Sequence, residues 1–234
     1  MTGVQTCALP IYITRLLDAR PDIRSAITSE DGHIYTLPSV EELGLVQFPN
    51  FLYLNTDWLA AVGMDMPSTI EELHDVLLAF KEKDPSGTGR PIPLSFIPGS
   101  FCANPWDLIT AYGGQADNND HRIVIDRKVV FTASSEQWKA GVKALSGWYQ
   151  EGLVDIESFS QDDTAYLAKG KTEQESLGAF FWWEATEFVG EEREGHYALC
   201  PVLAGADGVR RASVSNNQEI STVQIGRASC RERV

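Results

Sequence analysis

The chain has 234 residues, of which 43% are hydrophobic and 22% are charged, proportions that are ordinary for a globular protein. Its formal net charge of −14 argues against nucleic acid and anionic membrane surfaces as partners, because both carry charge of the same sign. No apolar run approaches the roughly 20 residues that a membrane-spanning helix needs. The composition suits a carrier of neutral ligands.

The two ends of the chain differ in character from the part between them. Residues 2–11, TGVQTCALPI, and residues 225–234, IGRASCRERV, read like translated sequencing-library adapters. Residues 1–11 also lack the basic start and the continuous apolar core of a signal peptide. We therefore expect segments 1–11 and 225–234 to be non-native, the protein's own signal peptide to be missing, and the native piece to span residues 12–224.

The first third of the chain predicts four short elements and one longer helix. In the longer helix, apolar residues recur at helical intervals, and Ser68 and Glu71 have the spacing of a capping box. This helix is therefore expected to bury one face. The five elements are a helix over residues 12–19 that ends before Pro21, a strand over 32–37 that ends at Pro38, a strand over 51–55, a helical turn that ends at Gly63, and the helix over 68–83.

The loop after this helix has the first half of a calcium-binding pattern. Asp84, Ser86 and Thr88 occupy the first, third and fifth places of an EF-hand loop, with Gly89 at the sixth. The acids that should follow are missing, because the next four residues are RPIP and Ser95 stands where a bidentate Glu belongs. On ligand count we expect a glycine-rich turn that ends the helix and holds no metal; the alternative is a loop that retains calcium.

The rest of the chain alternates between strands and helices. Asn104 is predicted to be the N-cap of a helix that Gly113 follows, and Ser134 and Gln137 have the spacing of a second capping box. The run LGAFFWW, residues 177–183, is the clearest buried strand. The other predicted elements are a strand over 92–96, a hairpin over 122–131, a helix over 134–152 whose Trp138 and Trp148 face the core, a helix over 162–170, a helix after residue 183 and a strand near 196–200.

Patterns of a metal or catalytic centre are missing from the sequence. The histidines at positions 33, 74, 121 and 196 are scattered without zinc-binding spacing. There is no GxxxxGKS/T or GxGxxG phosphate loop and no GxSxG nucleophile elbow. With 33 acidic residues in the chain, no single carboxylate pair stands out. We expect neither an enzyme nor a bound cofactor or metal.

Two cysteines remain once the adapter-like ends are set aside. Cys102 and Cys200 lie far apart in the sequence, and their separation does not decide whether they pair. A disulfide is open to them if the protein is exported. Two free buried thiols are the more frequent arrangement, and we expect those.

The order of short sequence motifs between residues 31 and 89 indicates a family resemblance. DGHIYTLPS is followed by LYLNTDWLAAVGMDMPSTIEELHDVLLAFKEKDPSGTG, and this succession resembles the extracellular solute-binding proteins of sugar ABC importers. The chain is most similar to the lipoprotein branch that handles oligosaccharides, and the resemblance extends over residues 12–223. The resemblance is specific because many weak motifs occur in the right order, and no single catalytic motif contributes to it.

The resemblance implies an α/β fold of the type II periplasmic-binding-protein class. Residues 39–210 would form most of the C-terminal lobe, and residues 12–38 and 211–224 would be pieces of the N-terminal lobe. The resemblance also implies a monomer that captures an oligosaccharide by lobe closure and passes it to the permease subunits of an ABC importer. Such a protein works outside the cytoplasmic membrane, either anchored there by a lipid or free in the periplasm.

Aromatic residues are the expected ligand-binding groups, because sugar rings stack their C–H faces on aromatic side chains while their hydroxyls bond polar ones. Trp182 and Trp183 end the buried strand, and neighbouring strand residues point to opposite faces. One of them should therefore be core, and we expect the other, Trp183, to lie in the cleft beside Glu184. Trp106 and Asn104, at the start of their helix, are the remaining candidates. The alternative is that all three tryptophans are core residues.

Two rival functions stay open on the sequence alone. A sugar-sensing domain of a signalling receptor would share the fold and differ in its flanking segments. A polysaccharide-processing enzyme would need a defined carboxylate pair about 5–10 Å apart in a groove.

Overall fold

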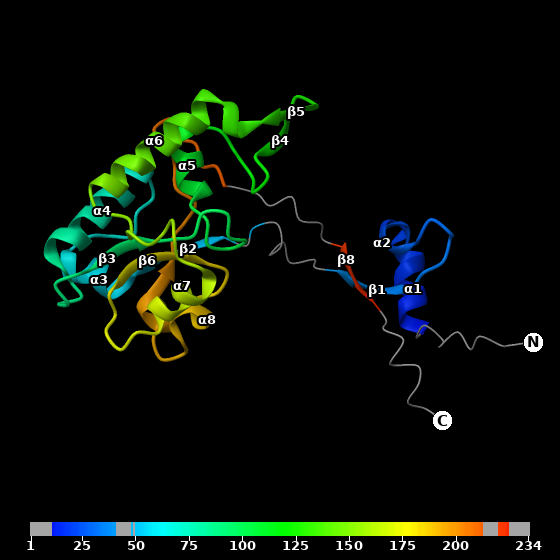
Figure 1. Cartoon of the computed structure of the whole chain (residues 1–234), viewed down its shortest axis with the longest axis horizontal. Helices are drawn as coiled ribbons and strands as arrows, with labels where there is room; N and C mark the ends of the chain where they lie inside the picture. The colour runs from blue at the N-terminus through cyan, green and yellow to red at the C-terminus, as the bar shows by residue number, and fades with distance from the viewer. Residues whose placement is uncertain (1–10, 41–47, 49, 213–219, 225–234) are drawn as a thin grey trace, which may run out of the picture. The chain divides into compact units, whose positions relative to one another are not determined.

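The computed structural model describes residues 11–40, 48, 50–212 and 220–224 and separates into two units (Figure 1). The smaller unit comprises residues 1–46 and 217–234, and the larger unit comprises residues 47–216. The two ends predicted to be non-native lie outside the described residues, apart from Ile11. We assigned Ile11 to the non-native end, whereas in the structure it is the first residue of a helix.

A helical pair and a two-stranded sheet make up the described part of the smaller unit. Its buried apolar side chains are those of Leu17, Ile23 and Ile27, so this core is small. Tyr12 and Tyr35 are largely exposed. The elements are α1 (Ile11–Ala19), α2 (Pro21–Ile27), β1 (Thr36–Val40) and β8 (Ile220–Gln224), which pairs with β1 in antiparallel fashion.

Strand β1 differs from the strand predicted over residues 32–37. It begins at Thr36 and continues to Val40, so that Pro38 lies inside it, opposite Thr222, instead of ending it. Within the described residues β1 pairs on one side only, and an edge strand tolerates a proline that has no N–H to donate. Upstream of β1, Ile34 contributes an isolated bridge.

A four-stranded mixed sheet lies at the centre of the larger unit. It consists of β2 (Phe51–Asn55), β3 (Ile92–Ser95), β6 (Leu177–Trp182) and β7 (Tyr197–Leu199), in the order β3-β6-β2-β7. Strands β3 and β6 are parallel, whereas β2 is antiparallel to both β6 and β7. Every residue of β6 is buried, which confirms the prediction of a buried strand in this run.

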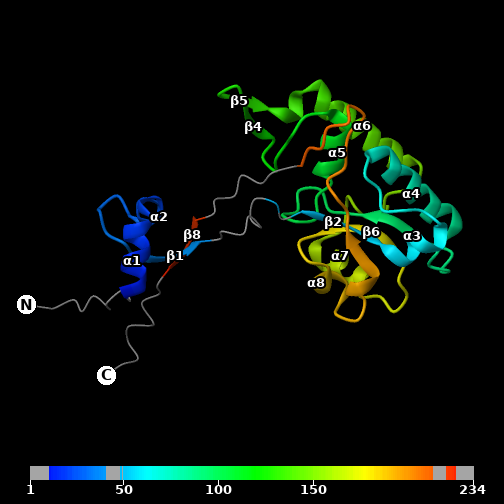
Figure 2. The ribbon, with the colours of Figure 1, turned by 180° about the vertical axis from the view of Figure 1, so that it is seen from behind.

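Helices cover both faces of this sheet (Figures 1 and 2). They are α3 (Thr56–Val62), α4 (Ile70–Lys83), α5 (Trp106–Gly113), α6 (Glu136–Gln150), α7 (Asp163–Gly170) and α8 (Ala185–Val189). Phe181 of β6 belongs to the core that includes α3 to α6. Phe180 and Trp182 belong to a second core with α7 and α8. The fold is therefore α/β, as the resemblance implied.

Helices α5 and α6 approach each other closely because a glycine lies where they cross. A Cβ atom on Gly141 of α6 would come within 2.4 Å of the backbone oxygen of Ile109 in α5. On the face of α5 toward α6, a Cβ on Gly113 would come within 2.3 Å of the Gln137 oxygen. A short hairpin of β4 (Arg122–Ile125) and β5 (Lys128–Phe131) connects the two helices, as predicted.

The first predicted capping box is displaced by one residue, and the second is not formed, because a simple N-cap one residue later takes its place. The N-cap of α4 is Thr69, whose hydroxyl accepts from the backbone N–H of Glu72, so the box is formed one position after the predicted Ser68. Ser68 instead donates its hydroxyl to Glu72 Oε2 at 2.9 Å. The N-cap of α6 is Ser135 rather than Ser134, and its hydroxyl accepts from Trp138 N. In both cases two adjacent residues carry hydroxyls, and packing decides which of them ends the loop.

The two cysteines of the larger unit are both buried and free, which confirms the expectation of separate thiols. Burial raises the pKa of Cys102 to about 11 and that of Cys200 to about 12. Of the helices in the described ranges, none combines the length and the apolar character needed to cross a membrane.

Candidate ligand-binding site

One edge of the sheet in the larger unit collects the candidate site residues. Strands β3 and β6 are parallel, with Ser95 opposite Phe180, and their carboxyl ends therefore lie at the same edge of the sheet. The loop 96–105 follows β3 there, and residues 183–187 follow β6. Strand β2 runs the opposite way and begins at this edge, with Phe51 opposite Trp182. In α/β sheets the carboxyl ends of parallel strands are the usual place for ligands.

The hydroxyl of Tyr166 in α7 holds the ends of these two parallel strands together. It lies 3.0 Å from the carbonyl oxygen of Ser95 and 2.9 Å from that of Phe181, and it accepts from Phe181 N at 3.1 Å. Burial raises the pKa of Tyr166 well above its ordinary value, so this hydroxyl stays protonated and able to donate. The edge is thereby a rigid platform for the loops that follow it.

Trp182 and Trp183 separate as the strand alternation predicts. Trp182 is 6% exposed, and its ring lies 5.9 Å from the rings of both Tyr166 and Phe188 in the second core. Trp183 is 44% exposed. One of the two tryptophans is therefore core and the other stands at the surface of the edge, where a ligand has access to it.

Glu187 of α8 links the two indoles. Its Oε2 accepts from the Nε1–H of Trp182 at 2.8 Å and also from the Nε1–H of Trp183. A surface tryptophan whose indole N–H is hydrogen-bonded loses rotational freedom, which favours stacking of a ligand on its face. Glu184 lies at the N-cap position of the same helix, is exposed, and makes no side-chain capping bond. Its carboxylate remains an acceptor at the edge.

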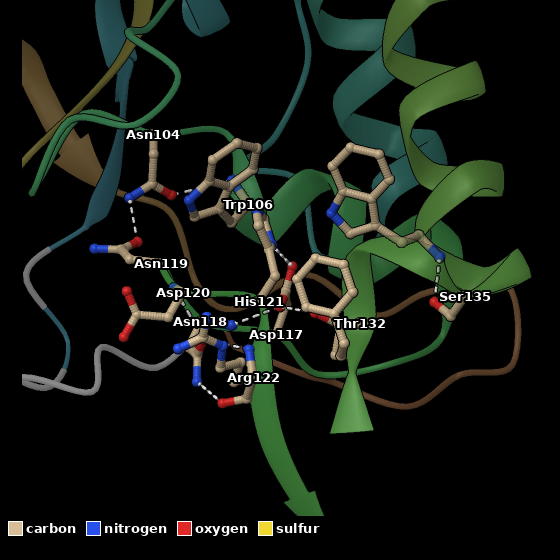
Figure 3. A network of polar contacts seen from close by, with 12 residues as sticks. Asn104, Trp106, Asp117, Asn118, Asn119, Asp120, His121, Arg122, Thr132 and Ser135 are labelled. Atoms are coloured by element: carbon tan, nitrogen blue, oxygen red, sulfur yellow. Dashed lines mark hydrogen bonds and ion pairs between the residues drawn. The ribbon is translucent and has the colours of Figure 1, made fainter. Parts of the chain in front are cut away.

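Asn104 is almost fully buried, and its polar groups are occupied. Its backbone N–H and carbonyl both bond the side-chain amide of Asn50, each at 2.9 Å. Its own side chain accepts from Trp106 N at 3.1 Å and donates to Asn119 Oδ1 at 3.2 Å (Figure 3). It also donates to Ser100 O at 3.2 Å. The N-cap residue of α5 is Pro105, not Asn104 as predicted, although the Asn104 side chain still bonds the first turn. Asn104 positions the loop.

Trp106 lines a cavity of about 320 Å³ between α5 and α6. The cavity wall is almost entirely apolar, and neither Trp183 nor Glu184 belongs to it. Trp106 is thus joined to the edge through the hydrogen bond that its backbone N–H donates to Asn104, and it shares no cavity with Trp183. The other lining residues are Pro98, Pro105, Ile109, Trp138, Val142, Leu145, Ser146, Tyr149 and Phe159.

An Asp–His pair supports the inner wall of this cavity. His121 Nδ1 lies 2.8 Å from Oδ2 of the buried Asp117, whose Oδ1 accepts from the Thr132 hydroxyl (Figure 3). The imidazole ring meets the rings of Trp106 and Trp138 edge to face, with centroids 5.1 and 5.5 Å away. Trp138 is therefore partly buried beside the core, and Trp148, at 3% exposed, is inside it. The pair orients two tryptophans.

Asn50 and Glu187 are the residues that sequence reasoning missed. Asn50 precedes the predicted strand by one position and contacts a residue 54 positions away, which no local pattern reveals. Glu187 follows Trp183 by four positions, which is one helical turn. That spacing was the available signal, because a helix was predicted to start directly after the strand.

The architecture and the edge define a lobe of a type II solute-binding protein. A profile of the family described as bacterial extracellular solute-binding protein matches residues 16–225, and the chain belongs to this family. In a set of well-characterised proteins, it is 37% identical over 212 residues to the fructooligosaccharide ABC transporter substrate-binding protein FusA of Streptococcus pneumoniae serotype 4 (strain ATCC BAA-334 / TIGR4). This match covers 87% of the chain and 38% of FusA. The chain therefore spans well under half the length of that relative.

Three further matches support the same assignment. The chain is 26% identical over 151 residues to the lipoprotein LipO of Bacillus subtilis (strain 168), covering 62% of the chain and 29% of LipO. The solved structure of FusA in complex with kestose superposes with a TM-score of 0.77 at 36% identity, covering 88% of this chain and 43% of that one. An EF-hand mutant of FusA in complex with fructo-nystose gives a TM-score of 0.78 at 35% identity, with coverages of 90% and 44%.

Proposed function

We propose that the protein containing this chain is the substrate-binding component of a carbohydrate ABC importer. It binds an oligosaccharide between two lobes, closes on it and releases it unchanged to the permease. The observation that carries the proposal is Trp183, a partly exposed indole that Glu187 holds at the carboxyl edge of the sheet. A fixed aromatic face beside free carboxylate oxygens is what stacking and hydrogen bonding of a sugar ring require.

The proposed site has Trp183 as its stacking platform and Glu184 as an acceptor for sugar hydroxyls. Trp182 supports the platform from the core side, and Asn104 holds the loop that borders it. Trp106, which bonds to that loop, lies next to the site rather than on the same platform. This division of roles follows from burial: only Trp183 and Glu184 of the five candidates are exposed.

The ligand class is proposed from the relatives. FusA is named as a fructooligosaccharide-binding protein and was solved with kestose and with fructo-nystose. Short fructooligosaccharides are therefore the first ligands to test. We also propose that residues 39–210 form most of the C-terminal lobe, that 12–38 and 211–224 belong to the other lobe, and that the full protein is a lipid-anchored monomer on the extracytoplasmic face.

The experiment uses the full reading frame that contains this chain. Kestose and nystose are titrated while tryptophan fluorescence is followed, with maltotriose as the comparison sugar. Replacing Trp183 by Ala should weaken binding roughly tenfold or more, which corresponds to about 1.4 kcal/mol. Phe131→Ala is the matched control, because Phe131 is a 54% exposed aromatic on the β4–β5 hairpin. Equal affinities for the wild type and both variants would overturn the assignment of Trp183.

A further inference from the structure

The turn after α4 begins with the first half of an EF-hand pattern, and FusA, a relative of this chain, was solved as an EF-hand mutant. An EF-hand loop of twelve residues supplies calcium ligands from positions 1, 3, 5, 7, 9 and 12, the last being a bidentate Glu. In this chain the loop would run over residues 84–95. Asp84, Ser86 and Thr88 would stand at positions 1, 3 and 5. The hydrogen bonds that their side-chain oxygens make show whether these residues could bind a cation.

Positions 9 and 12 of the loop cannot supply their usual ligands. Position 9 is Ile92, the first residue of β3, whose backbone N–H donates to Ser176 O at 2.7 Å. Position 12 is Ser95, which is fully buried and donates its hydroxyl to Asp155 Oδ2 at 2.7 Å. A serine turned into the core cannot replace a bidentate carboxylate turned toward the loop. The strand that follows the loop therefore excludes the ligands of positions 9 and 12, the second of which is the bidentate carboxylate.

The first half of the loop is closed by its own hydrogen bonds. Asp84 Oδ2 accepts from Gly89 N at 2.6 Å, and Asp84 Oδ1 accepts from the Ser86 hydroxyl. Thr88 Oγ1 lies 2.7 Å from Ser86 Oγ and accepts from Arg90 N at 3.1 Å. The oxygens that an EF-hand turns toward calcium are here satisfied by N–H and O–H donors.

The surroundings do not replace the missing ligands. Ser86 lines a surface hollow of about 360 Å³ together with Glu173, Glu175 and the cationic Arg193. Arg193 donates to the Glu173 carbonyl at 3.0 Å, and Glu175 faces His196 Nδ1 at 3.0 Å. A guanidinium beside the loop disfavours a second cation. Within the described ranges, His, Cys, Asp and Glu side chains nowhere gather in threes or more as a metal site.

We infer that in this loop a hydrogen-bonded turn takes the place of the EF-hand cation, so that the fold of the loop does not depend on calcium. The turn keeps the geometry that ends α4, because Asp84 holds the left-handed C-cap position with a φ of 43°. The inference is independent of which ligand the protein carries.

The test measures the thermal midpoint of the full reading frame in 5 mM CaCl₂ and in 5 mM EGTA. A loop site with a Kd of about 10 µM would add about 3.7 kcal/mol in calcium, which raises the midpoint by roughly 3 °C if the whole protein unfolds as one unit and by roughly 10 °C if one lobe unfolds alone. We expect a difference below about 1 °C and no saturable heat on calorimetric titration with calcium. A protein with an intact EF-hand, treated in parallel, is the positive control.

Asp84→Asn separates this loop from any other site, because it keeps a hydrogen-bond acceptor and removes the charge that calcium needs. Saturable binding that Asp84→Asn abolishes would overturn the inference. Calcium binding that persists unchanged in Asp84→Asn would place the calcium site elsewhere in the protein, and the inference about this loop would then be supported. Neither measurement depends on sugar affinity. The calcium test can therefore be interpreted even if the proposed function is wrong.

Discussion

The side-chain amide of Asn50 bonds both the backbone N–H and the backbone carbonyl of Asn104, each at 2.9 Å. Asn50 directly precedes β2, and Asn104 ends the loop that follows β3, so the two bonds join segments that meet at the carboxyl edge. Both partners of Asn50 are backbone groups of a nearly buried residue. The loop beside the proposed site is thus held by a residue outside it.

Replacing Asn50 by Ala should destabilise the protein by about 1–3 kcal/mol, because it leaves a buried N–H and a buried carbonyl without partners. Asn50→Asp keeps the acceptor and loses the donor, and we expect it to lie between Ala and the wild type. Urea denaturation at constant m-value measures both. An Asn50→Ala variant as stable as the wild type would show that water replaces the amide at no cost.

Glu187→Ala should weaken oligosaccharide binding about fivefold, or roughly 1 kcal/mol, because Trp183 then samples more ring orientations before it stacks. Glu187→Gln keeps a carbonyl acceptor for the indole N–H and should stay near the wild type. Near-ultraviolet circular dichroism reports tryptophan ordering, and urea denaturation controls for lost stability. If Ala and Gln variants bind equally well, Glu187 does not position the platform.

The sequence predicts the strand and the tryptophans of this site better than the residues that hold them in place, which are Asn50 and Glu187. The run at residues 177–182 is apolar throughout, so a buried strand follows, and strand alternation separates Trp182 from Trp183. The bonds of Asn50 to a residue 54 positions away depend on which strands pair, and strand pairing is not written in any local pattern. The role of Glu187 requires both the helix start and the inward rotation of Trp182.

The displaced details have a common physical cause. Ser68 and Thr69 are both favourable caps as residue types, and tertiary packing chooses between them. Pro38 is tolerated within β1 because, within the described residues, that strand pairs on one side only. Sequence patterns predict the boundaries of helices and strands to within a residue or two. Contacts with residues distant in the sequence determine the residue at which each element begins.

Gly141→Ala should destabilise the protein by about 1–3 kcal/mol, because the added methyl overlaps the Ile109 backbone where α5 and α6 cross. Gly147→Ala on the same helix is the matched control. Its added methyl meets nothing within 4 Å, and it should be neutral or stabilising by up to about 1 kcal/mol. Thermal and urea denaturation of both variants test this contrast. Equal effects of the two substitutions would contradict the close crossing.

The free thiols should resist alkylation in the folded protein. Burial raises the pKa of Cys102 to about 11 from an ordinary value of 9.0, so the thiolate fraction at pH 8.5 falls by roughly 50-fold or more. Because the unfolded thiols ionise first, stability from this source is present below about pH 9 and declines as pH rises toward 11.

Iodoacetamide labelling at pH 8.5, read by mass spectrometry, compares native and urea-unfolded protein in a variant with Ser at positions 7 and 230. We expect Cys102 and Cys200 to be labelled in the unfolded protein and to remain largely unlabelled in the native one. Rapid labelling of both thiols under native conditions would contradict their burial.

The central claim is that the carboxyl edge of this sheet receives an oligosaccharide. The most direct measurement is a crystal structure of the full reading frame grown with kestose or nystose. The account predicts a sugar ring stacked on the Trp183 indole at about 4 Å, with a hydroxyl donating to Glu184. A bound oligosaccharide that contacts neither Trp183 nor any residue of the loops 96–105 and 183–187 would contradict it.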